Sequence, residues 1–489
     1  MRLIAYMKPY AHWVIFALLL VLGLTAFDLY RPMLVGDAID TFGANGDFDV
    51  IIATAIKYAV VLALSFTFNI AQTWILQKTG QNIILQMRKD LYRHIQSLGS
   101  RYFDITPVGK LVTRVTNDVE ALNEMYSGIL VQLFRNIVKI VGLAGVMLVL
   151  DVRLAAISFV LMPLVIGLTV LCQKIARNIY RLYRTRLTDI NTFLSEHLSG
   201  MKIIQIFGRQ ERKFEEFHDK NTKLYKAFYR EMLMYAVFRP LIYILSILSL
   251  MIVLWFGSRN VFDEIISVGT LYIFSNYIRS FFDPIQELAE QFSTLQSSIA
   301  SAEKIFTVMD EDEFIPEVEN PKQPDKITGK IEFDHVWFAY DGENYVLKDV
   351  SFVINPGEKV AFVGATGAGK SSILNLIGRY YDIQKGHIYI DGIDIRQLSK
   401  KQLRSAIGQM QQEVFIFEGD VAYNIRLNDD NITDAQVKAA AEYVNASHFI
   451  EKLPQGYPEP VTERGATFSA GARQLLSFAR TLAHNPSIL

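Results

Sequence analysis

The stretch VAFVGATGAGKSS, residues 360–372, decides the fold of the C-terminal part of the chain. Its apolar start predicts a strand at KVAFVGA, and the following helical segment reads SILNLIGRYY. Between them, the residues match the spacing G-x-x-x-x-G-K-S/T. Glycines let the backbone curl so that successive N–H groups point at phosphate oxygens, next to the positive end of the helix. The pattern predicts a phosphate-binding loop made of Gly364, Ala365, Thr366, Gly367, Ala368, Gly369, Lys370, Ser371 and Ser372.

This loop predicts a nucleoside triphosphate as ligand. The Lys370 ammonium can reach the β- and γ-phosphates, and the Ser371 hydroxyl can ligate Mg²⁺. A glycine-rich turn without a ligand is the alternative, and a strand before the motif with a helix after it argues against that. We therefore expect ATP and Mg²⁺ as cofactors.

Upstream of the loop, KIEFDHVWFAY and VLKDVSFVI predict two further strands. Together with the loop they predict an α/β nucleotide-binding domain over residues 329–489. The preceding segment, 311–328, is acidic, proline-rich and without periodicity, so it is predicted to be a linker.

The remaining residues, 1–310, predict a membrane domain. Half of the chain, 51%, is hydrophobic, and six apolar stretches are long enough for a bilayer core, at 11–33, 51–76, 128–150, 153–173, 233–257 and 267–291. The sixth is the weakest, because it carries Arg279, Asp283, Glu287 and Glu290. It is retained because an even number of spans returns the chain to the side of the nucleotide domain.

Basic residues predict the orientation. The connection between the first two stretches has aspartates and no Lys or Arg, whereas the long segments 78–127 and 174–231 are rich in Lys and Arg. Segments of the second kind stay in the cytoplasm. We expect a multi-pass protein of the cytoplasmic membrane, with both termini and the nucleotide domain in the cytoplasm.

The two long segments predict helices that continue into the cytoplasm, turn and return. Their tips carry Tyr102, Phe103, Asp104, Ile206 and Phe207 as candidate contacts to a nucleotide domain. Pro107 and Gly109 predict a helix break in the first tip. Solvated hairpins without a partner are the alternative, which would leave apolar side chains uncovered.

Charges inside the apolar stretches should face protein or a water-filled cavity, because they are costly in lipid. Pairing between helices, or snorkelling near the interfaces, is the expectation for Asp28, Arg135 and Lys139. Arg239 and Arg279 are candidate cavity residues. The net charge of −1 argues against a nucleic-acid partner, and with Cys172 as the only cysteine no intrachain disulfide can form.

These residues together carry a resemblance: the chain resembles an ABC transporter half of the exporter type. The segment YFDITPVGKLVTRVTNDV is similar to the family's coupling segment, and IGQMQQEVFIFEGDVAYNI is similar to its Q-loop region. The resemblance implies that Tyr340 stacks on adenine and that Gln412 senses Mg²⁺ and the attacking water. It also implies a second half-transporter as partner, together with the lipid bilayer and a small-molecule or lipid substrate.

The signature motif departs from the family pattern. Where the family reads LSGGQ, this chain has FSAGA. The resemblance implies that Ser469, Ala470, Gly471 and Ala472 face the partner's ATP. Ala470 adds a methyl group and Ala472 removes a glutamine side chain. The change resembles heterodimeric bacterial multidrug exporters with one weakened ATP site, which favours a heterodimer over a homodimer.

The resemblance also implies residues that this sequence does not contain. After ARTLAHNPSIL the family continues to an Asp for Mg²⁺, a catalytic Glu and a switch histidine. We therefore expect a C-terminally truncated sequence, incomplete before the Walker B motif, which binds ATP but hydrolyses it poorly.

The function implied is ATP-driven export of a small amphipathic compound, such as a drug or lipid, by alternating access. The alternatives are a lipid flippase homodimer, an ATP-gated channel or regulatory subunit, and a soluble ATPase that only associates with membranes. The substrate and the partner's identity are not implied by any motif.

Overall fold

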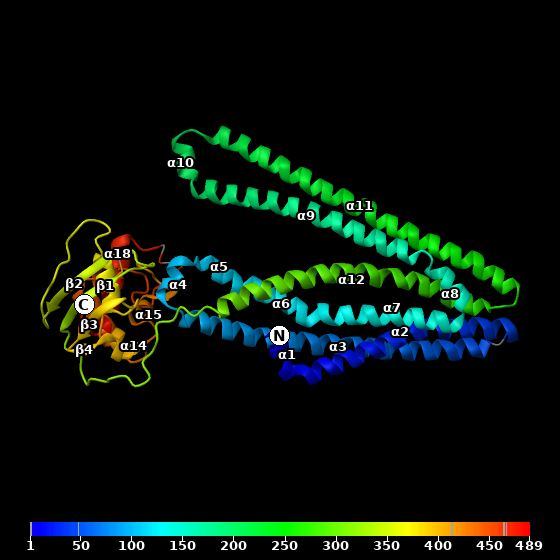
Figure 1. Cartoon of the computed structure of the whole chain (residues 1–489), viewed down its shortest axis with the longest axis horizontal. Coiled ribbons are helices and arrows are strands. Elements are labelled where there is room, and N and C mark those ends of the chain that lie inside the picture. Colours follow the sequence, from blue (N-terminus) through cyan, green and yellow to red (C-terminus); the bar gives the residue numbers. More distant parts are fainter. Residues whose placement is uncertain (1, 47, 412–413, 463–464, 466) are drawn as a thin grey trace. The chain divides into compact units, whose positions relative to one another are not determined.

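The structure, a computed structural model, describes residues 2–46, 48–411, 414–462, 465 and 467–489 (Figure 1). It divides into two compact units, which we describe one at a time. Unit 1 comprises Met1–His94 and Leu111–Asp310, and unit 2 comprises Ile95–Lys110 and Glu311–Leu489.

The described part of unit 1 is helical. Its elements are α1 (Arg2–Met7), η1 (Lys8–Tyr10), α2 (Ala11–Asn45), α3 (Phe48–Ser97, which enters unit 2), α5 (Val108–Thr113), η2 (Arg114–Asp118), α6 (Val119–Glu124), η3 (Met125–Ile129), α7 (Leu130–Leu150), α8 (Val152–Phe159), α9 (Met162–Ser199), α10 (Met201–Ile206), α11 (Gln210–Phe262) and α12 (Val268–Met309).

Five stretches among the described residues are helical and apolar enough to cross a membrane. They are Arg2–Gly43, Phe48–Ser97, Val108–Leu150, Val152–Ser199 and Gln210–Phe262. The sixth predicted span lies in α12, a helix of 42 residues that carries the four charges noted above. Its apolar side chains Phe274, Tyr277 and Ile278 are buried with those of α7, α8 and α11. The count of six spans therefore stays a prediction.

Close backbone approach joins α2 to α12. A Cβ on Gly269 would lie 2.1 Å from the carbonyl oxygen of Gly36, so neither helix tolerates a side chain there. The backbone N–H of Gly269 also donates to Asp40 at 2.6 Å. Small residues are the usual means of packing helices within a membrane.

The charges expected to pair within the bundle do so in part. Arg135 on α7 donates to Asp28 on α2 at 3.3 Å, and Arg31 binds the same carboxylate. The pairing prediction is thus confirmed for Asp28 and Arg135. Lys139 has no ion pair among the described residues, so of the two expectations for it only snorkelling remains as a prediction.

The helices α9 and α11 run side by side and are joined through α10 (Figure 1). They have 38 and 53 residues, so both extend well beyond the thickness of a bilayer core. At the turn, Ile203, Ile206 and Phe207 are exposed. The structure thus has two long helices joined by a turn, as predicted, and their extension into the cytoplasm stays a prediction.

Unit 2 is built on an antiparallel sheet with strand order β2-β1-β3-β4. Its strands are β1 (Ile331–Phe338), β2 (Leu347–Ile354), β3 (Lys385–Ile390) and β4 (Ile393–Asp394), and its other elements are α4 (Ser100–Ile105), α13 (Lys370–Ile377), η4 (Ile395–Gln397), α14 (Lys400–Ser405), β5 (Gly419–Asp420), α15 (Val421–Arg426), α16 (Asp434–Tyr443), α17 (Ser447–Ile450), β6 (Pro460–Val461) and α18 (Ala470–Ala483). The predicted strands at 331 and 347 are confirmed. Phe333, Phe338 and Ile388 form the core between this sheet and α13.

The strand predicted at KVAFVGA is wrong for the described residues. Residues 359–363 form no ladder, and Val363 is 90% exposed. A strand needs a neighbour that accepts and donates its backbone hydrogen bonds. The isolated parallel bridges in the described part of unit 2 join Lys322 to Leu398 and Ile407 to Ile488, and neither includes this segment.

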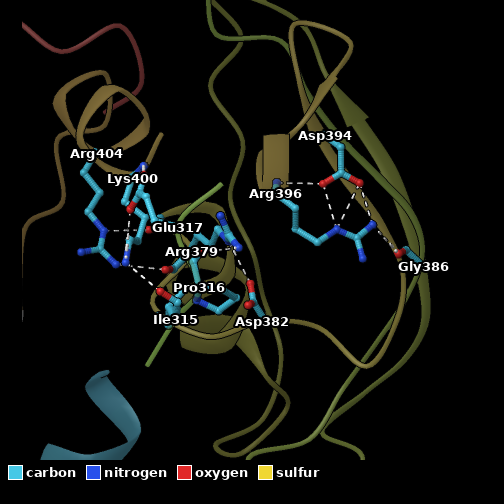
Figure 2. Close-up of polar contacts among 11 residues, drawn as sticks. Ile315, Pro316, Glu317, Arg379, Asp382, Gly386, Asp394, Arg396, Lys400 and Arg404 are labelled. Carbon is cyan, nitrogen blue, oxygen red and sulfur yellow. Dashed lines mark hydrogen bonds and ion pairs between the residues drawn. The ribbon is translucent and has the colours of Figure 1, made fainter. Parts of the chain in front are cut away.

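Residues 313–317, which we call the docked segment, are fixed to unit 2 by hydrogen bonds (Figure 2). Lys400 donates from Nζ to the carbonyl oxygen of Ile315 at 2.7 Å and from its backbone N–H to Glu317 at 2.9 Å. Burial raises the pKa of Glu317, but hydrogen bonds from Lys400 outweigh it and hold that pKa below its usual value. Part of the predicted linker is therefore held in place.

Replacing Lys400 with methionine should release the docked segment. The loss of its contacts, about 1 kcal/mol, should speed amide deuterium exchange at residues 313–318 by about five-fold. The neighbouring Lys401 is exposed, so Lys401→Met serves as the matched control. Equal exchange in the two variants would contradict the prediction.

The Asp394 carboxylate on β4 makes polar contacts with His387 on β3 and with Arg396, which follows β4. Arg396 donates to its carboxylate at 2.6 Å and His387 lies 2.9 Å away (Figure 2 shows the arginine). Burial raises the pKa of Asp394, but these hydrogen bonds outweigh burial and lower it to about 2.

The low pKa of Asp394 gives a pH-dependent stability. A carboxyl group whose pKa is lower in the folded state stabilises the fold at pH values above its unfolded-state pKa, which is about 3.9 for Asp. This stabilisation is lost as the pH falls towards 2, the pKa in the folded state. Asp394→Asn should therefore lower the unfolding free energy by about 1–2 kcal/mol at pH 7. Denaturant midpoints measured at pH 7 and pH 3 should show the difference shrink, whereas a constant difference would count against it.

Candidate functional site

The glycine-rich loop has the geometry that phosphate binding requires. Gly367 and Gly369 have positive φ values of 88° and 85°, which favour glycine. A Cβ on Gly369 would lie 2.6 Å from Leu347, so a side chain is excluded there as well. Gly369 is also the N-cap of α13, and because it has no side chain the first N–H groups of that helix keep no side-chain partner. The predicted helix after the loop is confirmed as α13.

Lys370 lies over the curled loop. Its Nζ donates to the carbonyl oxygens of Gly364 and Ala365, at 2.9 and 2.8 Å. An ammonium group held beside a row of backbone N–H groups fits a triphosphate, because it can exchange the two carbonyls for phosphate oxygens. The donor set in this loop therefore fits ATP.

The fit to Mg²⁺ depends on one side chain of the loop. Ser371 is exposed at the start of α13. No group of three or more His, Cys, Asp or Glu residues that could hold a metal is found among the described residues. A hydroxyl beside phosphate oxygens is a usual Mg²⁺ environment, so Ser371 fits the role. Gln412, the other predicted ligand, lies outside the described residues.

Tyr340 approaches the loop from the sheet. Its hydroxyl lies 2.9 Å from the Ser372 hydroxyl, and its ring meets the edges of Phe338 and Tyr381, with centroids 4.7 and 5.0 Å away. The structure thus places Tyr340 beside the phosphate loop. Its stacking on adenine stays a prediction.

Tyr381 links this cluster to the first tip, and the sequence analysis missed it. Its hydroxyl donates to Asp104 of α4. Burial raises the pKa of Tyr381, and the carboxylate of Asp104 raises it further. The signal in the sequence was the pair of tyrosines after α13, Tyr380 and Tyr381. Hydropathy cannot tell which of the two makes the contact.

Backbone contacts fix the same tip. The N–H of Gly99 donates to the carbonyl oxygen of Glu313 at 2.7 Å, and Arg101 pairs with Glu313 at 3.2 Å. Arg379, which follows α13, donates from its buried guanidinium to Pro316 at 3.1 Å. The docked segment therefore connects two elements of unit 2. It accepts a hydrogen bond from Arg379 after α13 at one point, and it contacts the start of α4 at another. Tyr102 is half-buried and Phe103 is 38% exposed in this tip.

The altered signature begins α18. Ser469 is the N-cap of this helix, and its hydroxyl accepts from the N–H of Ala472 at 3.1 Å. Ala470 and Gly471 are exposed in the first turn, where backbone N–H groups favour an anion. The part that these residues play at a partner's ATP stays a prediction.

A polar cluster inside the membrane domain was also missed. Asn136 on α7 donates to Glu287 at 2.9 Å and to Gln291 at 3.3 Å on α12, and Gln291 donates to Gln132 at 3.0 Å. The signal was polar residues four apart on each helix, which share a face. Of the predicted cavity residues, Arg279 is exposed and lies apart from this cluster, and the side chain of Arg239 lies outside the described part. A cavity role for both stays a prediction.

A glycine-rich lysine loop at a helix N-terminus, in one chain with membrane-length helices, defines an ATP-binding membrane protein. Comparison with family models agrees: residues 14–285 match the ABC transporter transmembrane region, and residues 347–489 match the ABC transporter model. The chain belongs to the ABC transporter family, with the arrangement of an exporter-type half-transporter.

Similar proteins cover nearly the whole chain. The ABC transporter ATP-binding protein exp8 of Streptococcus pneumoniae is 38% identical over 100% of this chain and 83% of its own length. A Bacillus subtilis protein, YheH, named as a multidrug resistance ABC transporter ATP-binding/permease protein, is 37% identical over 88% of this chain and 64% of its own. The ATP-dependent lipid A-core flippase of Desulfotalea psychrophila is 31% identical over 97% of this chain and 82% of its own.

Proposed function

We propose that the protein exports a small amphipathic substrate across the cytoplasmic membrane, as one half of a dimeric ABC exporter driven by ATP. The observation that carries this proposal is a chain of contacts from the phosphate loop to the first tip. Ser372 of the loop is hydrogen-bonded to Tyr340, the Tyr340 ring packs edge-on against Tyr381, and the Tyr381 hydroxyl donates to Asp104. A nucleotide site joined to the end of a membrane helix pair can convert ATP binding into helix movement. The relatives named for multidrug resistance and lipid A-core flipping support an amphipathic substrate.

The mechanism proposed is alternating access. ATP bound by Lys370 and the loop N–H groups would be closed over by the signature residues of the partner, while Ser469 and Gly471 of this chain would close over the partner's ATP. Mg²⁺ held by Ser371, and by Gln412 as predicted, would neutralise phosphate charge in hydrolysis. ATP shifts the equilibrium only because it binds the closed dimer more tightly.

The two tips would carry this closure to the membrane helices. The first tip contacts its own nucleotide domain through Asp104. The second tip presents Ile206 and Phe207, which are 68% and 71% exposed, and we propose that the partner's nucleotide domain covers them. Both termini and the nucleotide domain would lie in the cytoplasm.

A heterodimer is favoured over a homodimer, because Ala470 and Ala472 weaken the signature that serves the partner's site. Full ATPase activity from the full-length subunit alone would reject the heterodimer. A lipid flippase homodimer would then be the second candidate.

Transport in sealed vesicles tests the proposal as a whole. The full-length subunit with its partner should move a fluorescent amphipathic dye against a gradient only when MgATP is present. An ion current that ATP opens without dye accumulation would instead indicate an ATP-gated channel or a regulatory subunit.

A further inference from the structure

Arg379, in the turn after α13, combines three costly features in one residue. Its side chain is only 4% exposed, and the guanidinium pairs with Asp382 at 2.9 Å. Its Nη1 is enclosed and has no hydrogen-bond partner among the described residues. Its backbone φ is 48°, in the left-handed region that favours glycine. A buried charge with an unused donor and a strained backbone is typical of a functional position.

The guanidinium of Arg379 also holds the docked segment (Figure 2). Its Nη2 donates to the carbonyl oxygen of Pro316 at 3.1 Å. A planar guanidinium donates in fixed directions, so the pairing with Asp382 sets the direction of the bond to Pro316. The position of the docked segment therefore depends on the turn that follows α13.

Helix α14 joins the same two parts of unit 2 by a second route (Figure 2). Arg404, in its last turn, donates to the carbonyl oxygens of Gly378 and Arg379 at 3.3 and 3.0 Å. Lys400, at its start, donates to Ile315 of the docked segment, as described above. The end of α13, the docked segment and α14 thus form a closed ring of hydrogen bonds. A shift of α13 would reach the docked segment from two sides.

The other end of α13 is the phosphate loop. The helix runs from Lys370 to Ile377, about 12 Å, and Gly378 is its C-cap. Phosphate bound at Lys370 and at the first N–H groups of the helix would fix its start. Because so short a helix moves as a rigid rod, the same event would fix its end, where Arg379 follows the cap.

We propose that Arg379 is a positioning residue through which nucleotide bound at the loop tightens the docking of residues 313–317. Residues 310–312 alone separate this segment from the end of α12 at Met309, so docking acts on the chain that leaves α12. The inference rests on the proposed function and adds a regulated contact to it. It is separate from the contact of Tyr381, which ends on α4.

Amide deuterium exchange of the full-length subunit, with and without a non-hydrolysable ATP analogue and Mg²⁺, tests the inference. In the wild-type protein the nucleotide should slow exchange at residues 313–318 by about five-fold, the effect of strengthening about one hydrogen bond. Arg379→Met should exchange at the same rate in both states. A purely structural role for Arg379 would instead raise the exchange rate in both states and keep their ratio.

Arg396 offers a matched control within unit 2. Like Arg379, it donates to a nearby carboxylate, that of Asp394, and to a backbone carbonyl, that of Gly386, but these contacts lie on β4 and β3 (Figure 2). Arg396→Met should therefore lose stability and keep the wild-type ratio of exchange rates.

A second variant covers the case in which Arg379→Met does not fold. Arg379→Lys keeps the buried positive charge but not the planar fork that reaches two acceptors. It should therefore lose most of the response to nucleotide.

Binding of the same analogue, measured on every sample, keeps this inference apart from the proposed function. Coupling between two sites is reciprocal, so loss of the Arg379 contact should change nucleotide affinity by no more than about five-fold. The inference is overturned if the wild-type protein binds nucleotide without slower exchange at 313–318, or if an Arg379 variant keeps the wild-type ratio. The proposed function stands in both cases. A wild-type protein that does not bind nucleotide would count against the proposed function instead.

Discussion

Lys370→Ala is expected to weaken MgATP binding by about ten- to a hundred-fold and to abolish ATP-dependent transport. The ammonium group of Lys370 donates to two loop carbonyls and would move to phosphate oxygens when ATP binds. A hydrogen bond to a charged group contributes about 1.5–3 kcal/mol, and each 1.4 kcal/mol is a factor of about ten. Equilibrium binding of a fluorescent ATP analogue with Mg²⁺ measures the loss.

Lys359 provides the control for Lys370. It is an exposed lysine shortly before the loop, so Lys359→Ala removes the same charge without touching the phosphate site. Its affinity for MgATP should equal that of the wild-type protein. If both variants bind ATP normally, the loop at 364–372 is not the nucleotide site.

Tyr381→Phe should separate ATP hydrolysis from transport. The variant keeps the ring against Tyr340 and Phe338 but loses the hydrogen bond to Asp104, a loss of about 1 kcal/mol. ATP binding should stay unchanged, whereas substrate moved per ATP hydrolysed should fall about five-fold, because nucleotide-dependent movement no longer reaches the tip. Asp104→Asn should have the same direction of effect. Transport and ATPase rates in the same vesicles give the ratio.

Tyr380 is the control for Tyr381. It is the preceding residue, and its ring packs under the guanidinium of Arg404, with 4.7 Å between them. Tyr380→Phe keeps that packing and should transport with the wild-type ratio. A normal ratio in Tyr381→Phe would remove the contact with Asp104 from the proposed coupling route.

Local patterns were enough to predict the elements that local chemistry determines. The loop at 364–372, the helix after it and the break at Pro107 each depend on glycine, proline or a run of neighbouring residues, and the structure has all three. A phosphate-binding loop is readable because its function depends on backbone conformation within nine residues.

Features that depend on distant partners could not be predicted. The strand at 359–363 had the right composition, but a strand also needs a hydrogen-bonded neighbour, and the described residues give it none. The contact of Tyr381 with Asp104 joins residues far apart in the sequence. The contacts of Asn136 with Glu287 and Gln291 could not be predicted for the same reason, because they join α7 to α12 across more than 150 residues, although the charge of Glu287 was evident in the sequence.

Helix α11 contains Pro240 in its interior, which makes this position a site where the long helix can bend. Proline removes one backbone hydrogen bond within the helix, so bending is easiest there. From Pro240 to the start of the helix at Gln210 is 30 residues, or about 45 Å. A change of about 10° in the bend would therefore swing the α10 end by about 8 Å, so a small change of angle at Pro240 gives a much larger displacement at the turn between α9 and α11.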